Sequence, residues 1–314
     1  MVRGALLGEG TYGSVFQGTL NGERVAVKRI KPHELRPGMN FTALREVRYL
    51  RVLGHENIVR LLDTYISERT LFLVLEFCPS DLEKLVRDKS VFLSPPDVKA
   101  YVRMTLEAVA FCHSQGVLHR DIKPANLLLS EQGLVKLADF GLARSLASPG
   151  NALTHQVATR WYRAPELLFG PTSYGFAPDV WSCGCVFGEL LLRTPLFPGE
   201  TDPNQLQKIF ALLGTPSSAD WPGLTTLPGF LLFETCEAMS ADQWRRLFGG
   251  HSAEATDLLL AMLVLSPHCR ISAADALRHD YLAVPPTATL PSDLRLPGSR
   301  TTGEKRPFAA TTMV

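Results

Sequence analysis

The sequence predicts an α+β fold with two lobes, a small β-rich N-terminal lobe and a larger, mostly helical C-terminal lobe. Up to about residue 77 the chain shows short apolar runs typical of strands, with one amphipathic helix among them. From residue 81 onward helical patterns dominate. A chain of 314 residues, 46% of them apolar, is long enough for two lobes with a substantial core.

Strands and a single helix are expected in the first lobe. An Asn-Gly pair separates two strand-like runs within residues 5–30 and predicts a hairpin turn. Over residues 41–53 apolar side chains recur at helical spacing, which predicts an amphipathic helix. A further apolar strand is expected over residues 71–77. Because only seven residues precede Gly8, the first strand is expected to be short.

Helices are expected to build most of the second lobe. They are predicted over residues 95–114, 179–192, 204–213, 254–265 and 272–279. After Val284 the composition changes to Pro, Thr, Ser and Gly, so the remaining residues are expected to be extended or disordered. The predicted organisation is one folded unit over 1–283, with an N-lobe 1–77, a hinge 76–81 and a C-lobe 82–283, and a tail over 284–314.

Composition and charge exclude several classes of function. A formal net charge of +1, without interleaved basic and aromatic residues, argues against nucleic acid as a partner. The longest uncharged apolar run, residues 258–265, is far too short to span a membrane. None of the six cysteines stands in a C-x-x-C pair, which disfavours a zinc site and indicates a reducing compartment. A cytoplasmic or nuclear location is expected.

Three strings in order carry the chemistry of the chain. They are His119-Arg120-Asp121-Ile122-Lys123-Pro124-Ala125-Asn126, Asp139-Phe140-Gly141 and Ala164-Pro165-Glu166. Asp121 offers a carboxylate that can accept a hydroxyl proton, and Asn126 and Asp139 offer the oxygen ligands that Mg²⁺ prefers. Together the strings fit the protein-kinase signature, with Ile122 where the pattern usually has Leu.

A glycine-rich string precedes them and indicates a site for phosphates. It reads Gly8-Glu9-Gly10-Thr11-Tyr12-Gly13-Ser14-Val15. Glycines allow the backbone to approach phosphates without a Cβ clash. A dinucleotide-binding fold would need a helix directly after them, whereas a hairpin is predicted here. The next strand carries Lys28, which is placed to meet phosphates, and Glu46 on the amphipathic helix is its candidate partner.

The nucleotide is expected to lie between the glycine-rich string and the hinge. Backbone groups at Glu76 and Cys78 would pair with the adenine, and Leu75 would guard the pocket behind it. Asp81 is a candidate ribose contact, a helix N-cap, or both. The residues expected around ATP are Leu7, Gly8, Glu9, Gly10, Gly13, Val15, Ala26, Lys28, Leu75, Glu76, Cys78, Asp81 and Leu128.

The chain resembles a protein kinase over residues 4–283 and, within that class, the cyclin-dependent kinases. The string over residues 40–46 stands where that family has its helix signature, and residues 159–166 carry a marker of the broader group. The resemblance implies ATP and Mg²⁺ as cofactors, with Asp121 orienting the substrate hydroxyl and Lys123 neutralising the transferred phosphoryl group. A cyclin or another activating subunit is an expected partner.

The resemblance also implies regulation by phosphorylation. Thr154 stands at the position of a single activating phosphosite, and Arg45, Arg120 and Arg144 stand where the family places the arginines that bind its phosphate. Phosphorylation of Thr154 is expected to order residues 142–163 and raise kcat. Thr11 and Tyr12 occupy positions that are inhibitory phosphosites in some relatives.

Two subfamilies compete for the finer assignment. Arg163 is expected to engage the backbone near Ala158, which implies substrates with Ser or Thr followed by Pro, since proline lacks an amide. Residues 108–113, 123–126, 156–159 and 283–294 look closer to the cell-cycle-related kinase, which phosphorylates other kinases and controls the assembly or length of cilia and flagella.

The alternative is the kinase that activates other cyclin-dependent kinases, which usually has Asn where this chain has Ala125. A kinase-fold scaffold without catalysis is a second alternative, but it predicts the loss of Lys28, Asp121 or Asp139, and the sequence retains all three.

Overall fold

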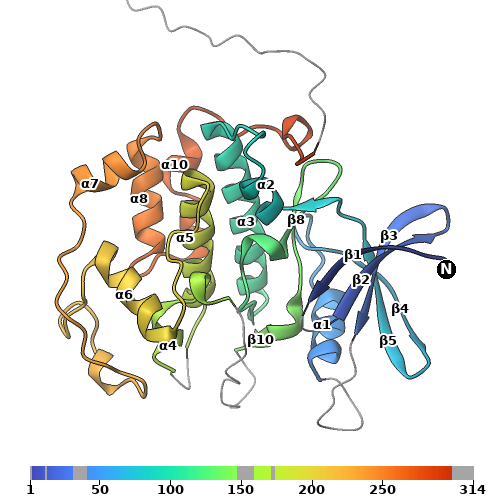
Figure 1. Cartoon of the computed structure of the whole chain (residues 1–314), viewed down its shortest axis with the longest axis horizontal. Helices are drawn as coiled ribbons and strands as arrows, with labels where there is room; N and C mark the ends of the chain where they lie inside the picture. The colour runs from blue at the N-terminus through green and yellow to red at the C-terminus, as the bar shows by residue number, and fades with distance from the viewer. Residues whose placement is uncertain (1, 11–12, 31–40, 147–158, 171–173, 299–314) are drawn as a thin grey trace, which may run out of the picture.

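Two lobes lie side by side in the computed structural model of the chain (Figure 1). The structure describes residues 2–10, 13–30, 41–146, 159–170 and 174–298. The N-terminal lobe holds an antiparallel sheet and one long helix, and the C-terminal lobe is mostly helical. The predicted bilobal α+β architecture is therefore confirmed.

The N-terminal sheet has five strands in the order β1-β2-β3-β5-β4. They are β1 (Val2–Gly10), β2 (Gly13–Leu20), β3 (Glu23–Ile30), β4 (Leu61–Ser67) and β5 (Thr70–Glu76). The turn between β2 and β3 is the predicted Asn-Gly hairpin, in which Asn21 and Gly22 both have positive φ, 51° and 87°.

The first strand corrects one prediction. β1 was expected to be short, but it spans nine residues and pairs with β2 from Val2 opposite Thr19 to Gly10 opposite Gly13. The residues before Gly8 are few, but Val2, Arg3 and Leu6 already pair with β2, across two register shifts, and so extend the strand.

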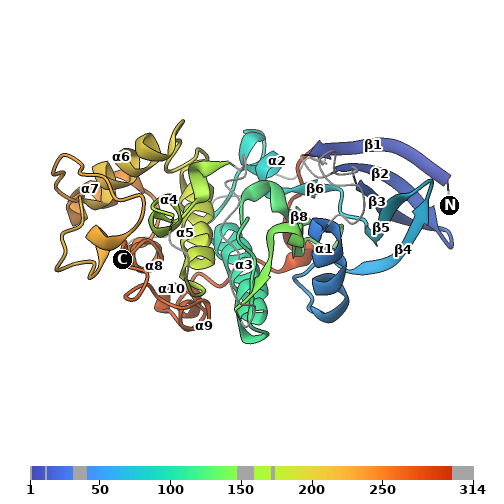
Figure 2. The ribbon, with the colours of Figure 1, turned by 90° about the horizontal axis from the view of Figure 1, so that it is seen from below.

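Long helices form the C-terminal lobe and pack around α3 and α5 (Figure 2). The helices of the chain are α1 (Phe41–Val52), α2 (Leu82–Arg87), α3 (Pro95–Ser114), α4 (Pro165–Leu168), α5 (Ala177–Leu192), α6 (Asp202–Leu213), α7 (Ala241–Leu247), α8 (Ala253–Met262), α9 (Ala273–Ala276) and α10 (Asp280–Ala283). Ser94 closes a capping box with Asp97 at the start of α3, which explains why this helix begins where it was predicted.

Short strands complete the lobe beneath the sheet. They are β6 (Ser80–Asp81), β7 (Val117–Leu118), β8 (Leu127–Leu129), β9 (Val135–Leu137) and β10 (Arg144–Ser145). β6, β8 and β9 form one small sheet, and β7 pairs with β10. These ladders hold the catalytic string between β7 and β8 and the Asp-Phe-Gly string between β9 and β10.

The helices of the C-terminal lobe differ from the prediction at two places. The helix expected over 272–279 is shorter and ends with α9 at Ala276. His279 then caps a separate helix, α10, by accepting a bond from the Tyr281 amide. No helix was predicted where the structure has α7. Ser240 forms a capping box with Gln243 at its start.

A continuous apolar core fills the C-terminal lobe and extends under the N-terminal sheet. Tyr101 on α3, Trp181 on α5 and Leu258 on α8 are all at most 1% exposed. A second, smaller cluster of Val25, Val27, Phe72 and Val74 lies within the sheet itself. The larger core makes the C-terminal lobe the base on which the catalytic residues are held.

Residues 285–298 correct the prediction for the tail. They run along α3, where the Lys99 ammonium donates to the carbonyls of Val284 and Pro286, both at 2.7 Å. The Thr289 hydroxyl donates to Asp97 at 2.6 Å, and Leu294 is buried at 8% exposure. This part of the tail is extended but packed, because side chains of α3 satisfy its backbone groups.

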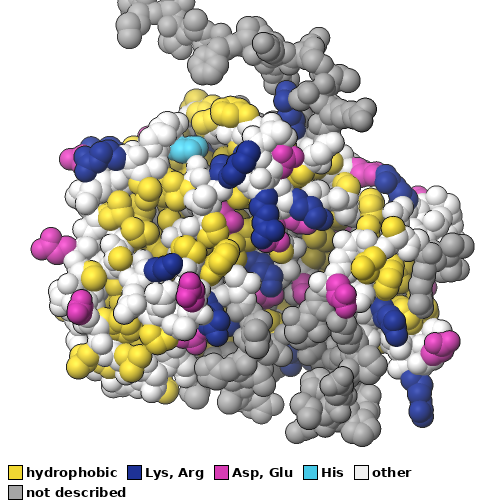
Figure 3. All heavy atoms as spheres, in the orientation of Figure 1, with side chains coloured by type: hydrophobic (Ala, Val, Ile, Leu, Met, Phe, Trp, Pro, Cys, Tyr) yellow, Lys and Arg dark blue, Asp and Glu magenta, His cyan; other side chains and the backbone are white. Residues whose placement is uncertain are grey.

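The surface carries charges of both signs. Figure 3 shows basic and acidic side chains interspersed over one face of the molecule. Among the described residues no helix is both long and apolar enough to cross a membrane.

Candidate active site

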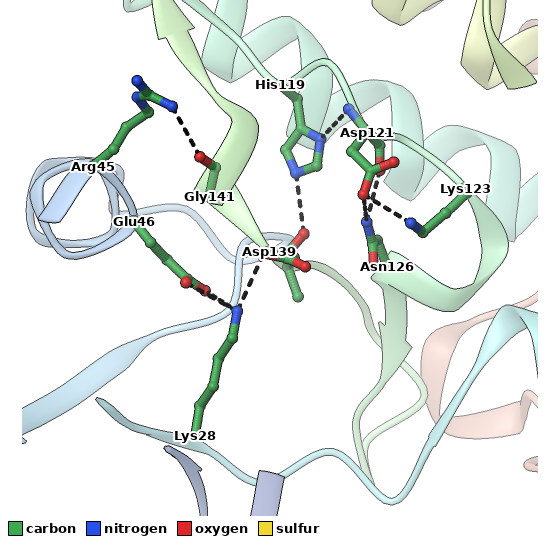
Figure 4. Close-up of polar contacts among 10 residues, drawn as sticks. Lys28, Arg45, Glu46, His119, Asp121, Lys123, Asn126, Asp139 and Gly141 are labelled. Atoms are coloured by element: carbon green, nitrogen blue, oxygen red, sulfur yellow. Dashed lines mark hydrogen bonds and ion pairs between the residues drawn. The ribbon is translucent and has the colours of Figure 1, made fainter. Parts of the chain in front are cut away.

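Three charged side chains from three different elements meet between the lobes (Figure 4). Lys28 of β3 donates to both carboxylate oxygens of Glu46 on α1, at 2.7 and 2.9 Å. The same ammonium lies 3.1 Å from Oδ1 of Asp139, which follows β9. Lys28 and Glu46 are 8% and 2% exposed, so the sheet, the helix and the C-terminal lobe join at a buried ionic contact.

The pKa values of this cluster follow from burial and mutual charge. Burial disfavours the charged Lys28, but the carboxylates of Glu46 and Asp139 outweigh it and raise the pKa of the ammonium. Burial raises the pKa of Asp139, yet the Lys28 charge more than compensates and holds that pKa below its usual range. A cationic Lys28 and an anionic Asp139 therefore face each other between the lobes at neutral pH.

Asp139 has a left-handed backbone conformation, with φ 65° and ψ 68°. This conformation is uncommon for a residue with a side chain and occurs often at functional sites. It directs the carboxylate toward Lys28, while the next residue, Phe140, is fully buried and lies edge-on against His119 at 4.8 Å. His119 is itself fully buried, and its Nε2 bonds the Ala138 carbonyl at 3.0 Å, so it acts as a brace.

The catalytic string places three polar side chains in one group. Lys123 Nζ lies 2.8 Å from Oδ2 of Asp121, and the Asn126 amide nitrogen lies 2.9 Å from the same oxygen. Asn126 also donates to the Asp121 carbonyl at 2.7 Å, which fixes the turn between them. Because the amide nitrogen of Asn126 is used in these bonds, its oxygen is the atom that could bind a metal ion.

Strand pairing brings the predicted nucleotide residues together. Gly8 pairs with Val15, Val15 with Lys28, and Ala26 with Leu75, so four strands, β1, β2, β3 and β5, place these residues in adjoining rows. The remaining positions fall as follows: Leu7, Glu9 and Gly10 on β1, Gly13 on β2, Glu76 at the end of β5, Cys78 after it, and Asp81 opposite Leu128 in the β6–β8 pair.

Some of these side chains also have structural roles. Asp81 caps α2 through a 2.8 Å bond from the Lys84 amide, as one of its two predicted roles requires. The Glu76 carboxylate accepts from the Arg60 amide at 2.7 Å and pairs with Lys136 at 3.1 Å. Burial raises the pKa of the Cys78 thiol to about 12, so it stays protonated at neutral pH.

Two glycines of the glycine-rich string are required for different reasons. A Cβ at Gly13 would lie 2.2 Å from the Arg29 carbonyl oxygen, so the fold itself excludes a side chain there. A Cβ at Gly8 would meet no atom of the described residues within 4 Å. The fold therefore does not explain Gly8, whereas close approach of a ligand to the backbone would explain it.

Comparisons with known proteins agree with this geometry. The family model described as "Protein kinase domain" matches residues 1–282. The chain is 49% identical over 294 residues to cyclin-dependent kinase D-1 of Oryza sativa subsp. japonica, which covers 93% of this chain and 69% of that protein. It is 42% identical over 292 residues to serine/threonine-protein kinase KIN28 of Saccharomyces cerevisiae, covering 92% and 95% respectively.

A solved structure shows the same fold. One chain in the structure of the CAK complex from Chaetomium thermophilum bound to ATP-γ-S matches with a TM-score of 0.87 at 44% identity, over 93% of this chain and 94% of that one. The chain is a protein kinase of the cyclin-dependent family. It is accordingly a serine/threonine kinase that uses ATP, with Mg²⁺ as the usual kinase cofactor.

The kinase gathers three arginines beside the catalytic string. Burial lowers the pKa of Arg120, and the charges of Arg144 and Arg45 lower it further, which places the three side chains close to one another. Arg45 also donates to the Gly141 carbonyl at 3.1 Å (Figure 4). Thr154, whose phosphate this cluster is predicted to bind, lies outside the described residues, as do Thr11 and Tyr12.

The segment that ends at Glu166 is anchored deep in the kinase C-lobe. Arg270 donates to both Glu166 oxygens, at 2.6 and 2.9 Å. Arg163 lies 4.0 Å from Asp202, and Arg160 donates to the same carboxylate at 2.5 Å. Arg163 was predicted to engage the backbone near Ala158, which lies outside the described residues.

A buried aspartate of the kinase supports the catalytic string from below. Asp179 accepts from the amides of His119 and Arg120 at 2.7 and 2.8 Å. Its third partner is His113 Nε2, at 3.0 Å. Sequence reasoning missed His113, because no motif marks it. Its only signal is a position in the last turn of α3, shortly before the catalytic string.

Asp179 makes the stability of the kinase depend on pH in the acid range. Burial opposes its charge, but the hydrogen bond and charge of His113 outweigh burial and hold the pKa of Asp179 below its usual value. The stabilisation is thus complete above the unfolded-state pKa of about 3.9 and is lost as pH falls through the lower folded-state value. We expect urea unfolding between pH 5 and 3 to show a steeper loss of stability for wild type than for Asp179→Asn. Equal slopes would contradict this assignment.

Proposed function

We propose that this kinase phosphorylates and activates other cyclin-dependent kinases, acting on a serine or threonine hydroxyl. The contact of Lys28 with both Glu46 and Asp139 is the main support for catalysis, because an active phosphotransferase needs this cluster and a scaffold does not. The relatives support the activating half, because KIN28, cyclin-dependent kinase D-1 and the CAK complex all match over more than nine tenths of the chain.

The residues of the site divide the reaction among them. Asp121 orients the substrate hydroxyl and accepts its proton as the oxygen attacks the terminal phosphorus of ATP. Lys123, already 2.8 Å from that carboxylate, neutralises charge on the transferred group. Lys28, held by Glu46, fixes the α- and β-phosphates, and the glycine-rich string covers them.

The donor chemistry of the site suits Mg²⁺. The Asp139 carboxylate is ionised at neutral pH and the Asn126 amide oxygen is not used by the fold, so both are hard oxygen ligands. The ion, when bound with ATP, neutralises phosphate charge and lowers the barrier to transfer. These two residues would hold it at the floor of the cleft.

A cyclin-type subunit is the partner that we propose. The solved relative belongs to a complex, and the present chain exposes apolar side chains on the helix that carries Glu46. Leu44 and Val52 on α1 are 41% and 68% exposed, and Ile66 on β4 is 75% exposed. Burial of such side chains by a partner would fix α1, and with it the Lys28–Glu46 contact.

A transfer assay tests the proposed function. Wild type is expected to transfer phosphate from ATP to a catalytically dead cyclin-dependent kinase that keeps its activation-segment threonine. Lys28→Met, which leaves Glu46 without its cation, should lower kcat/KM by about 100-fold. Lys99→Met, at a lysine that contacts the tail and the Tyr281 ring and not the site, is the matched control. Equal rates for wild type and Lys28→Met would refute catalysis at this site.

Substrate preference separates the two subfamily interpretations. None of the relatives reported above has a ciliary name, so the ciliary interpretation rests on sequence alone, chiefly on Ala125 and its neighbours. It would be supported if the protein phosphorylated a Ser/Thr-Pro site on a ciliary kinase faster than the activation segment of a cyclin-dependent kinase. The reverse order of rates would support the activating function.

Phosphorylation of Thr154 is proposed to activate the kinase through the three arginines. Each charge-assisted bond from a guanidinium to phosphate is worth about 1.5–3 kcal/mol. Losing even one such bond therefore lowers the equilibrium constant for docking the phosphate roughly tenfold or more. Thr154→Ala is therefore expected to lower kcat at least about tenfold, and Arg144→Met should abolish the response of wild type to phosphorylation. Wild-type kcat in Thr154→Ala would show that the site is not activating.

A further inference from the structure

Arg193 ends α5 in a backbone conformation that usually belongs to glycine. Its φ is 60° and its ψ is 21°, which lies in the left-handed region. Helices often end on a residue in this region, but the residue is then usually Gly, because a Cβ makes the conformation costly. An arginine at this position therefore indicates that its side chain makes contacts that offset the cost.

The guanidinium of Arg193 makes those contacts by binding four main-chain carbonyls. Nε donates to Val86 at 3.1 Å, Nη1 to Val91 at 2.7 Å, and Nη2 to Leu85 and Asp88 at 2.8 and 2.6 Å. Leu85 and Val86 belong to the last turn of α2, where carbonyls have no partner within the helix. Among charged side chains, only arginine can make all four bonds, because its donors lie on three nitrogens in a fixed fork.

A further bond returns from the same segment to Arg193. Lys89, which follows α2, donates to the Arg193 carbonyl at 2.7 Å. In Figures 1 and 2, α2 lies between α5 and the N-terminal sheet. A helix of six residues is too short to be stable alone, so the position of α2 depends on its packing and on these bonds. Arg193 thus fixes the end of α2 to the end of α5.

The helix that Arg193 fixes adjoins two parts of the nucleotide site. α2 packs against the 3-10 turn Pro124–Asn126 and against β8. The turn carries Asn126, the proposed Mg²⁺ ligand, and β8 carries Leu128, which is expected beside the nucleotide. Leu82 and Leu85 of α2 are fully buried, and close-packed interiors transmit displacements. A shift of α2 would therefore displace Asn126 and Leu128.

We propose that Arg193 is a positioning residue for the nucleotide, acting through α2 on Asn126 and Leu128. Asp121 is held by Lys123 and Asn126, which belong to its own string. The role of Arg193 therefore concerns the binding of ATP with Mg²⁺ more than the transfer of the phosphoryl group. It rests on the nucleotide site of the proposed function, but not on the identity of the protein substrate.

Calorimetric titration with a non-hydrolysable ATP analogue and Mg²⁺ tests this role without a protein substrate. Arg193→Met removes all four bonds, and Arg193→Gly removes them while it also relieves the backbone conformation. Residues that orient a metal ligand from outside change metal affinity about 10–100-fold, so both variants are expected to raise the Kd of the analogue about tenfold. In transfer assays, kcat at saturating ATP should stay within about threefold of wild type.

Arg103→Met is the matched control. It removes an arginine of α3 that donates to the Leu282 carbonyl of α10, so it also breaks a guanidinium–carbonyl bond within the C-terminal lobe. The Kd of the analogue should keep its wild-type value in this variant. An unchanged Kd in both Arg193 variants, or an equal rise in Arg103→Met, would overturn the proposal.

Hydrogen exchange supplies a second measurement that does not need a stable variant. Coupling between two sites is reciprocal, so binding of the analogue to wild type should slow amide exchange over residues 82–91. The same amides should exchange faster in Arg193→Met than in wild type and at the wild-type rate in Arg103→Met. Equal exchange over residues 82–91 in free and nucleotide-bound wild type would overturn the proposal, even if Arg193→Met failed to fold.

Discussion

Asp121→Asn is expected to lower kcat by about 1,000-fold, within the range of roughly 10²–10⁴ that a positioned general base contributes. The change replaces a carboxylate oxygen with an amide and keeps the shape of the side chain. Asparagine cannot accept the substrate proton at neutral pH, and its amide hydrogens would face the Lys123 ammonium, which now lies 2.8 Å from Oδ2. Both effects remove stabilisation that is needed in the transition state.

The measurement is single-turnover transfer to a protein substrate, with ATP binding measured in parallel. ATP affinity should stay within about threefold, since Asp121 lies on the substrate side of the site and Lys28, Glu46 and Asp139 are untouched. Asp63→Asn makes the same chemical change at an exposed position on β4 and should keep wild-type kcat. A loss confined to ATP affinity, or a rate within tenfold of wild type, would contradict the role of Asp121.

The polar half of the site could be predicted from sequence because each residue belongs to a short string. Asp121, Lys123 and Asn126 are so close in sequence that one turn, with its 3-10 helix Pro124–Asn126, brings them together. Lys28 and Glu46 were predictable as a pair because a strand and a helix of known order carry them. Such short strings predict the same arrangement of side chains in any protein with this fold.

Tertiary contacts without a string could not be predicted. His113 reaches Asp179 across 66 residues of sequence, and only the packing of α3 against α5 brings them together. The packed tail is similar, because its composition resembles a disordered segment while Lys99 and Asp97, far earlier in the chain, supply its partners. Burial and partnering of this kind depend on the whole fold.

The subfamily assignment shows a different limit. The strings that favoured the cell-cycle-related kinase, such as residues 123–126, are few and short. The relatives reported above match over about 290 residues, they include a chain of the CAK complex, and none has a ciliary name. A handful of positions carries less weight than similarity spread over two lobes, and for this reason the activating function leads the proposal.

Arg270→Met is expected to lower the free energy of unfolding by about 3–5 kcal/mol, because it leaves Glu166 buried and unpaired. The two side chains are 0% and 3% exposed, and Arg270 binds both carboxylate oxygens. Arg270 also donates to the carbonyls of Val264, Leu265 and Ala177, which methionine would leave unsatisfied. The cost combines an orphaned charge with lost main-chain bonds.

Urea unfolding of a mutant cycle separates these two causes. Adding Glu166→Met to Arg270→Met removes the orphaned carboxylate, so the double variant should regain part of the lost stability, while the unsatisfied carbonyls keep it below wild type. Arg278→Met breaks an exposed ion pair with Asp275, 72% and 54% exposed, and should cause no measurable loss. If the double variant were no more stable than Arg270→Met, the buried charge would not be the cause. Because Glu166 ends the segment that carries Arg163, the same variants should lose activity in the order in which they lose stability.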